Sequence, residues 1–79
     1  MYILLTGCGG FIGFHLTLKL LKENKKIKII GIDNLNSYYS KKLKDERIKI
    51  LKKNSRFNFL KFDLINKKKL SNVFKKYNF

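Results

Sequence analysis

The sequence predicts an α/β fold with the element order βαβαβα, in which three parallel strands alternate with three helices. Three short runs rich in apolar and β-branched residues alternate with three longer segments of helical character. Strands that are linked by helices run parallel and have right-handed crossovers. We therefore expect half of a doubly wound sheet, with its strands in the order 3-2-1.

The first unit consists of a strand, a glycine turn and a helix. Residues 2–6 form an apolar run that leads directly into Gly-Cys-Gly-Gly-Phe-Ile-Gly over residues 7–13, and a helix is expected over residues 14–22. Backbone N–H groups at a helix N-terminus point towards an anion, and the helix dipole adds partial positive charge there. The unit therefore predicts a binding site for the pyrophosphate of a dinucleotide.

The glycine spacing narrows this prediction. Gly7, Gly10 and Gly13 fit G-x-x-G-x-x-G, whereas G-x-G-x-x-G read from Gly7 and Gly9 would need a glycine where Ile12 stands. Gly7 lets the chain turn off the strand, Gly10 admits a phosphate without a Cβ in the way, and Gly13 lets the helix pack closely on the sheet. No Gly-Lys-Ser/Thr closes the turn, which excludes a P-loop. A glycine turn that binds no ligand is the alternative.

The second unit begins with a strand over residues 27–32, which ends at Asp33. Asp33 lies about 20 residues beyond Gly13, the spacing at which an acidic residue meets the ribose hydroxyls of an adenine dinucleotide. A carboxylate accepts from both the 2′- and 3′-hydroxyls and repels a 2′-phosphate, so the sequence predicts NAD rather than NADP. The alternative for Asp33 is a turn or cap residue after a strand.

Two further helices and a third strand complete the pattern. Ser40 is expected to cap a helix that reaches about residue 52. One side of that helix carries Leu43, Arg47, Ile50 and Leu51. The third strand covers residues 57–62, and Asn66 caps a helix over residues 67–77. The apolar stripe of this last helix contains Leu70, Val73, Phe74 and Tyr77.

Three segments carry a resemblance to a known protein family. They are Thr-Gly-x-x-Gly-Phe-Ile-Gly over residues 6–13, Gly-Ile-Asp-Asn-Leu-Asn-Ser-Tyr-Tyr over residues 31–39 followed by Leu43, Lys44 and Arg47, and Phe-x-Lys-x-Asp-Leu over residues 59–64. Together they resemble the extended short-chain dehydrogenase/reductases, the nucleotide-sugar epimerases and dehydratases. The second segment most closely resembles the UDP-glucuronate 4-epimerases. UDP-galactose 4-epimerases and dTDP-glucose 4,6-dehydratases share the first part and stay open as alternatives.

The resemblance implies a partial Rossmann fold that binds NAD through ten residues. They are Gly7, Gly10, Phe11, Ile12 and Gly13 at the pyrophosphate, Asp33, Asn34 and Asn36 at the adenosine ribose, and Asp63 and Leu64 beside the adenine. The backbone amides of Phe11 and Ile12 would hold the pyrophosphate. The alternative for Asp63 is a simple turn carboxylate. Cys8 and His15 are expected to be structural.

The resemblance also implies a reaction that these residues do not perform alone. In the family a Tyr-x-x-x-Lys pair and a Ser or Thr, which lie downstream, act on the sugar, and a 4-keto intermediate interconverts UDP-glucuronate and UDP-galacturonate. We therefore expect residues 1–79 to be the N-terminal half of an NAD(P)-binding Rossmann domain, inactive alone. Tyr38 and Lys42 match the catalytic spacing but lie beside the expected adenosine end of the cofactor. The full-length enzyme is expected to bind a UDP-sugar and to form a homodimer.

The net charge of +14 raises an alternative of another class, a small basic module that binds nucleic acid or another polyanion. Seventeen of the nineteen basic residues are Lys and two are Arg, whereas arginine usually carries base readout and bidentate phosphate contact. The lysines are also spread along the chain. The sequence therefore favours a cofactor site without a specific nucleic-acid partner.

The remaining composition excludes several classes of site. The single cysteine excludes an intrachain disulfide and suits a reducing compartment, so we expect a cytoplasmic protein. No Cys/His cluster has metal-ligand spacing. No apolar run approaches the roughly 18 residues of a membrane span. Neither a metal nor a membrane partner is therefore expected.

Overall fold

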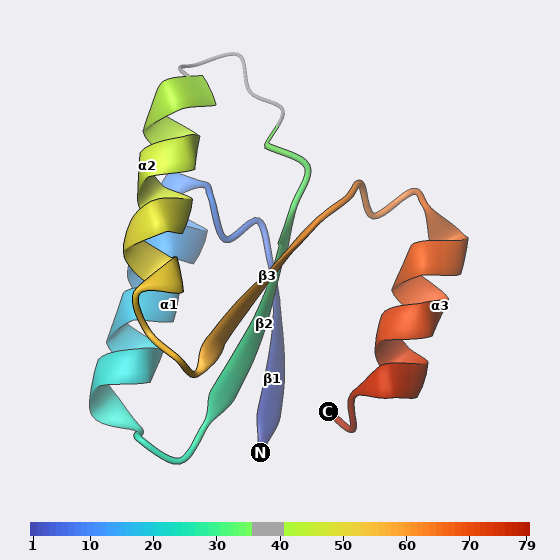
Figure 1. Cartoon of the computed structure of the whole chain (residues 1–79), viewed down its shortest axis with the longest axis horizontal. Helices are drawn as coiled ribbons and strands as arrows, with labels where there is room; N and C mark the ends of the chain where they lie inside the picture. The colour runs from blue at the N-terminus through green and yellow to red at the C-terminus, as the bar shows by residue number, and fades with distance from the viewer. Residues whose placement is uncertain (36–40) are drawn as a thin grey trace.

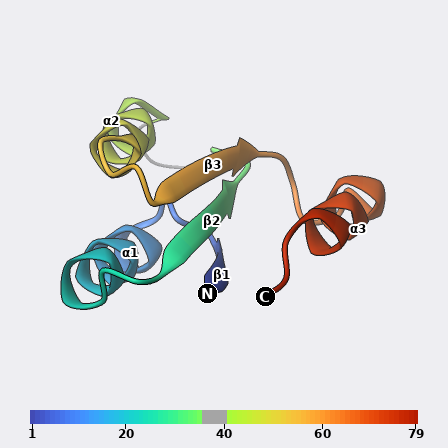
Figure 2. The ribbon, with the colours of Figure 1, turned by 60° about the horizontal axis from the view of Figure 1, so that its bottom comes forward.

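The computed structural model of the chain describes residues 1–35 and 41–79. Its elements, in chain order, are β1 (Tyr2–Thr6), α1 (Phe11–Glu23), β2 (Lys28–Asp33), α2 (Lys41–Lys52), β3 (Phe57–Lys61) and α3 (Lys67–Lys76). The strands form one parallel sheet in the order β1-β2-β3. Helices α1 and α2 lie on one side of the sheet and α3 lies on the other (Figure 1, Figure 2). The predicted α/β class and the strand order 3-2-1 are confirmed.

The strand register brings the ends of β1 and β2 together. Thr6 pairs with Ile32, and Asp33 pairs with Lys61 at the end of β3. The next residue after β1, Gly7, donates its N–H to the carbonyl oxygen of Ile32 at 2.7 Å. The glycine turn and Asp33 therefore lie at the same carboxyl edge of the sheet, where ligands bind in open α/β sheets.

The central strand β2 is buried on both faces of the sheet. Ile29 is fully buried against the α1 and α2 side, and Ile30 and Ile32 are buried on the α3 side, at 2% and 1% exposure. A strand that is covered on both faces reads as a continuous apolar run rather than as an alternating pattern. This explains the sequence Ile-Ile-Gly-Ile at residues 29–32.

Helix α2 turns a different side to the core than the sequence predicted. Ile48 and Leu51 are buried, whereas Leu43 and Ile50 are 44% and 46% exposed, so the predicted stripe is wrong at these two positions. Ile48 joins the cluster that contains residues of α1 and β2. The same side of the helix carries half-buried Arg47. The predicted cap, Ser40, lies outside the described residues.

Helix α3 covers the other face of the sheet with few side chains. Val73 is buried, Leu70 and Tyr77 are half-buried, and the Tyr77 ring lies 5.1 Å from that of Tyr2 on β1. Phe74 was predicted in this stripe but is 56% exposed, and its ring centroid lies 5.5 Å from that of Phe79 near the end of the chain. The predicted cap is confirmed, since the Asn66 side chain accepts from the N–H of Lys69.

The edge opposite the glycine turn is tied together by Arg56. Its guanidinium donates to the carbonyl oxygens of Leu21 at 2.6 Å, Asn24 at 2.7 Å and Ile27 at 3.1 Å. These carbonyls belong to the end of α1 and to the connection into β2, where helix carbonyls lack partners within the helix. Arg56 therefore fastens the C-terminal end of α1 to the start of β3.

The Gly31 position gives a first test of this packing. A Cβ on Gly31 would lie 2.7 Å from the Phe57 ring and 2.9 Å from the sulfur of Cys8. We expect Gly31→Ala to lower the free energy of unfolding by about 1–3 kcal/mol, since buried side chains would have to move. Urea denaturation measures this change. Adding Phe57→Leu should recover part of the loss, and strictly additive losses would contradict the contact.

Candidate functional site

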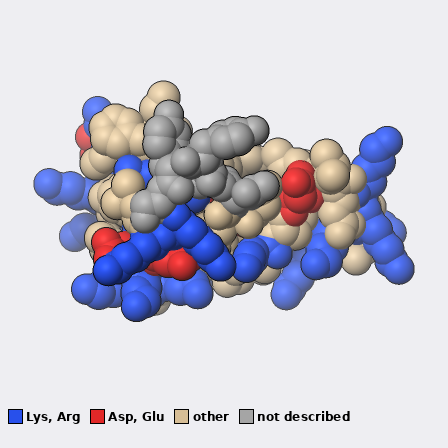
Figure 3. All heavy atoms as spheres, turned by 90° about the horizontal axis from the view of Figure 1, so that it is seen from above, with Lys and Arg blue, Asp and Glu red and all other residues tan. Residues whose placement is uncertain are grey.

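The carboxyl edge of the sheet carries a cavity of about 290 Å³ that is lined by residues from all three strand ends. The lining residues are Gly7, Gly10, Ile32, Asp33, Asn34, Lys44, Phe62, Asp63 and Leu64. Six of the ten residues predicted from the sequence are among them. When the molecule is viewed from above, towards this edge of the sheet, lysine and arginine side chains lie at both ends of the visible surface (Figure 3). The cavity is the candidate site for an anionic ligand.

The glycine turn leads into α1 earlier than the sequence predicted. Helix α1 begins at Phe11 rather than at residue 14, because Gly10 acts as its N-cap in an extended conformation. Gly7 has a φ of 71°, which confirms that it turns the chain off β1. No side chain caps the helix at Gly10. Within the described residues, the N–H groups of the first turn, which include those of Phe11, Ile12 and Gly13, therefore have neither an intrahelical partner nor a side-chain cap at Gly10.

Two of the glycines are required by close backbone packing. A Cβ on Gly13 would overlap the carbonyl oxygen of Gly7 and lie 3.2 Å from the Cα of Cys8. Gly13 therefore lets the first turn of α1 pack against the glycine turn. The sequence had predicted that Gly13 lets the helix pack against the sheet. A Cβ on Gly10 would lie 3.3 Å from the Gly7 carbonyl oxygen. The position of Gly10 in the cavity lining leaves room for a ligand at that point.

Asp33 connects β2 to the glycine turn. Its side chain is nearly buried, and its Oδ2 accepts from the N–H of Gly9 at 2.8 Å. Its Oδ1 accepts from the N–H of Leu35 at 2.8 Å, and the Lys44 ammonium lies 3.5 Å away. A buried charge is retained only when it is paired and hydrogen-bonded. Each carboxylate oxygen has two acceptor positions. Leu35 and Lys44 occupy both positions on Oδ1 and Gly9 occupies one on Oδ2, so these contacts leave one position on Oδ2 for a ligand.

Gly9 is a site residue that the sequence reasoning missed. A Cβ at this position would lie 2.9 Å from the Asp33 Oδ2. Glycine is therefore needed so that the turn can approach the carboxylate. The G-x-G-x-x-G pattern considered for the turn includes Gly9. The need for glycine there, however, comes from the contact with Asp33, which lies 24 positions further along the chain.

Helix α2 contributes two more residues that were not predicted in the site. Lys44 lines the cavity and forms the ion pair with Asp33. Arg47, one turn further, donates from Nη1 to the carbonyl oxygen of Gly9 at 3.1 Å. Both residues belong to a segment that resembles the family, but their contacts with Asp33 and Gly9 come from tertiary packing.

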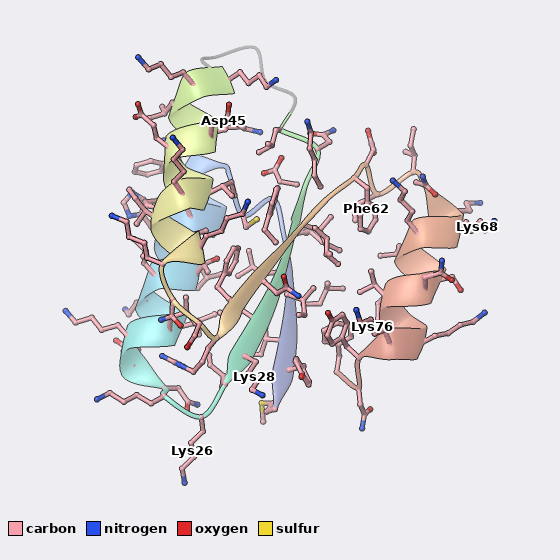
Figure 4. The ribbon with its side chains drawn as sticks, viewed as in Figure 1. Lys26, Lys28, Asp45, Phe62, Lys68 and Lys76 are labelled. Carbon is pink, nitrogen blue, oxygen red and sulfur yellow. The ribbon has the colours of Figure 1, made fainter. Side chains whose placement is uncertain are left out.

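The predicted adenine end lies between the ends of β2 and β3. Asn34 donates from its side-chain nitrogen to the Asp63 Oδ2 at 3.2 Å, and the N–H of Ile65 donates to the Asp63 Oδ1 at 3.1 Å. These two bonds, the backbone bond first, lower the pKa of the exposed Asp63 carboxyl. The bond to Ile65 is also what a turn carboxylate makes. The Phe62 side chain lies between β3 and α3 (Figure 4).

The other predicted site residues lie around the cavity rather than in its lining. Phe11 and Ile12 are 66% and 79% exposed on the first turn of α1. The ring of His15 packs 4.7 Å from that of Phe11, in agreement with its expected structural role. Asn36 and Tyr38 lie outside the described residues.

Cys8 is a structural residue, as expected. It is fully buried in the core beside α1 and β2. Burial, followed by the nearby Asp33 charge, raises the pKa of the Cys8 thiol to about 12. A thiol in this environment stays protonated and unreactive at neutral pH.

The described residues also bear on metal binding and on membrane insertion. Across residues 1–35 and 41–79, no group of three or more His, Cys, Asp and Glu side chains is arranged to hold a metal ion. Within the same described residues, no helix has both the length and the apolar character needed to cross a membrane.

Comparison with known proteins identifies relatives over nearly the whole chain. Residues 4–79 match the protein family described as GDP-mannose 4,6 dehydratase. The chain is 42% identical over 77 residues to a UDP-glucuronate 4-epimerase of Thermodesulfobacterium geofontis, which covers 98% of this chain and 23% of that protein. It is 47% identical over 74 residues to the protein CapI of Staphylococcus aureus, over 94% of this chain and 21% of that protein.

Solved structures share the same fold. The UDP-glucuronic acid 4-epimerase from Bacillus cereus, in complex with UDP-glucuronic acid and NAD, superposes with a TM-score of 0.86 at 40% identity, over 99% of this chain and 24% of that one. A dTDP-glucose 4,6-dehydratase from Bacillus anthracis, in complex with NAD, gives 0.83 at 29% identity, over 96% of this chain and 23% of that one. The chain thus spans only 21–24% of the length of these four proteins.

The buried thiol predicts how stability changes at high pH. The folded-state pKa of Cys8, about 12, lies above its ordinary value of 9.0, so the folded state favours the protonated thiol. This contribution to stability is complete below pH 9 and is lost as the pH rises towards 12. Denaturation at pH 8 and pH 10.5 should show a smaller decline for Cys8→Ala than for the unchanged protein. An equal decline in both would contradict this assignment.

At pH 8, iodoacetamide should modify the native thiol far more slowly than the urea-unfolded one.

Proposed function

The chain belongs to the GDP-mannose 4,6 dehydratase family, and we propose that it forms the NAD-binding portion of a nucleotide-sugar 4-epimerase. The observation that carries this proposal is the nearly buried Asp33 carboxylate at the end of β2, hydrogen-bonded to the glycine turn and lining a cavity with Gly7 and Gly10. The proposed unit is the N-terminal half of an NAD(P)-binding Rossmann domain. The catalytic and substrate-binding residues would lie in the rest of a protein as long as its relatives.

The residues that line the cavity fit the successive parts of an adenine dinucleotide, from the pyrophosphate through the ribose to the adenine, along the carboxyl edge of the sheet. The uncapped start of α1, beside Gly7 and Gly10, would hold the pyrophosphate through the amides of Phe11 and Ile12. Asp33 and Asn34 would take the adenosine ribose, with Asn36 assigned by the family pattern alone. Asp63 and Leu64 would border the adenine, and the cavity lining adds Phe62 there.

Asp33 supports NAD as the preferred dinucleotide. Its carboxylate can accept from a ribose hydroxyl, whereas a 2′-phosphate would bring a second negative charge to a nearly buried carboxylate. Lys44 already occupies the Oδ1 side of that carboxylate and offsets part of its charge. When bound, the nicotinamide would accept the hydride from the sugar and return it. The described residues bind and orient the opposite half of the cofactor.

The relatives support UDP-glucuronate as the substrate of the whole protein, interconverted with UDP-galacturonate through a 4-keto intermediate. Identity to the B. cereus UDP-glucuronic acid 4-epimerase is 40%, against 29% to the dTDP-glucose 4,6-dehydratase, which is the alternative together with a UDP-galactose 4-epimerase. A homodimer, a cytoplasmic location and the inactivity of residues 1–79 alone stay predictions.

The cofactor proposal is tested by binding of NAD to the protein and its variants. Asp33→Ala should weaken NAD binding at least tenfold, because hydrogen bonds to a charged group contribute about 1.5–3 kcal/mol. Gly10→Val should abolish binding, since the added side chain would occupy the cavity lining. Isothermal titration calorimetry measures both. Asp45→Ala is the matched control, because it removes the same charge from α2 at a residue that is not part of the cavity lining.

The same titrations separate this proposal from the polyanion alternative. A polyanion-binding module would bind nucleic acid with an affinity that falls steeply with salt and would be unaffected by Asp33→Ala. NAD affinity that is equal in the unchanged protein, Asp33→Ala and Gly10→Val would overturn the assignment of the site. The preference for NAD over NADP should also shrink in Asp33→Ala.

A further inference from the structure

The two arginines of this lysine-rich chain are both used on backbone carbonyls. Seventeen of the nineteen basic residues are lysine. Arg56 binds carbonyl oxygens at the edge of the sheet away from the cavity, and Arg47 binds that of Gly9 in the glycine turn. A planar guanidinium presents several fixed donors, whereas a lysine ammonium is a compact and mobile charge. The two positions are therefore those at which the shape of the side chain matters.

Arg47 acts on a peptide unit that also belongs to the helix cap. The carbonyl of Gly9 and the N–H of Gly10 lie in one planar peptide group. Arg47 donates to that carbonyl at 3.1 Å, and the N–H of Gly10 donates to the carbonyl oxygen of Gly7 at 3.0 Å. Holding the carbonyl therefore also holds the direction of the N–H and of the N-cap of α1.

The peptide unit on the other side of Gly9 is held as well. The N–H of Gly9 donates to the Asp33 Oδ2 at 2.8 Å. Glycine has the largest conformational freedom of any residue, so a turn with glycine at positions 7, 9 and 10 needs outside contacts to take one shape. Asp33 from β2 and Arg47 from α2 supply these contacts on the two sides of Gly9.

Arg47 is itself fixed by packing. It is half-buried, and its guanidinium carbon lies 5.9 Å from the ring centroids of both Phe11 and Phe14 on α1. It is not among the residues that line the cavity. It therefore acts through Gly9 rather than by contact with a ligand in the cavity.

We propose that Arg47 is a positioning residue that preorganises the glycine turn for a pyrophosphate. This gives α2 a second role at the dinucleotide site, besides that of Lys44, which lines the cavity. The proposal rests on the proposed function for the identity of the ligand. The ordering of the turn by Arg47 does not depend on that function.

The ordering is tested without any ligand by hydrogen–deuterium exchange of the protein. In Arg47→Met, the hydrogen-bonded amides of Gly9 and Gly10, read from peptides that cover residues 7–13, should exchange about tenfold faster, which corresponds to the loss of one hydrogen bond. Arg47→Lys should also exchange faster, because an ammonium replaces the stacked planar donor. Peptides from β2 should be unchanged in both variants. Arg56→Met and Arg56→Lys are the matched controls, and they should leave exchange in residues 7–13 unchanged.

Binding then tests the functional part of the proposal. NAD affinity should fall about tenfold in Arg47→Met and should stay within twofold of the unchanged protein in Arg56→Lys. Unchanged exchange over residues 7–13 in both Arg47 variants would overturn the positioning role. Faster exchange with unchanged NAD affinity would show that the turn is ordered for another purpose, and would also overturn it. If the unchanged protein binds no NAD, the proposed function fails while the exchange result still decides whether Arg47 orders the turn.

Discussion

The hydrogen bond between the Gly9 N–H and the Asp33 carboxylate is the contact on which the rest of the site depends. It joins the turn after β1 to the end of β2 across 24 positions of sequence, at 2.8 Å. Because the carboxylate approaches so closely, position 9 must be glycine. Because the carboxylate is nearly buried, it needs a counter-charge, which Lys44 provides from α2. This one contact thus accounts for the residue types at three places, which are the glycine turn, the end of β2 and α2.

The same contact explains how a small sheet can present a defined anion site. The parallel register places both strand ends at one edge, and the Gly7 bond to Ile32 continues the pairing by one residue. Helix α1 then starts without a side-chain cap, packed on the turn through Gly13. The backbone amides of its first turn are therefore held near Asp33 by backbone geometry. In the proposed site, local burial and preorganised donors would supply the affinity for a phosphate group, and the net charge of the chain is a separate, long-range property.

The sequence predicted the fold well because its information is local and periodic. The alternation of apolar runs and helical segments, with the glycine turn, is sufficient for the strand order. The start of α1 was predicted three residues late because Gly10 caps it without a side chain, so the usual cap residues are absent. Gly9, Lys44 and Arg47 were missed because their roles come from tertiary contacts. On α2, the predicted side contained Leu51, which is buried, but not Ile48, whose burial in the cluster with α1 and β2 residues comes from tertiary packing.

A crystal structure of the protein grown with NAD is the most direct test of the central claim, that Asp33 and the glycine turn together form the dinucleotide site. The account predicts a hydroxyl of the adenosine ribose within hydrogen-bonding distance of the Asp33 Oδ2, with the Gly9 bond to Asp33 retained and the pyrophosphate at the start of α1. An adenosine ribose bound away from Asp33, or a Gly9 bond that breaks when NAD binds, would contradict it.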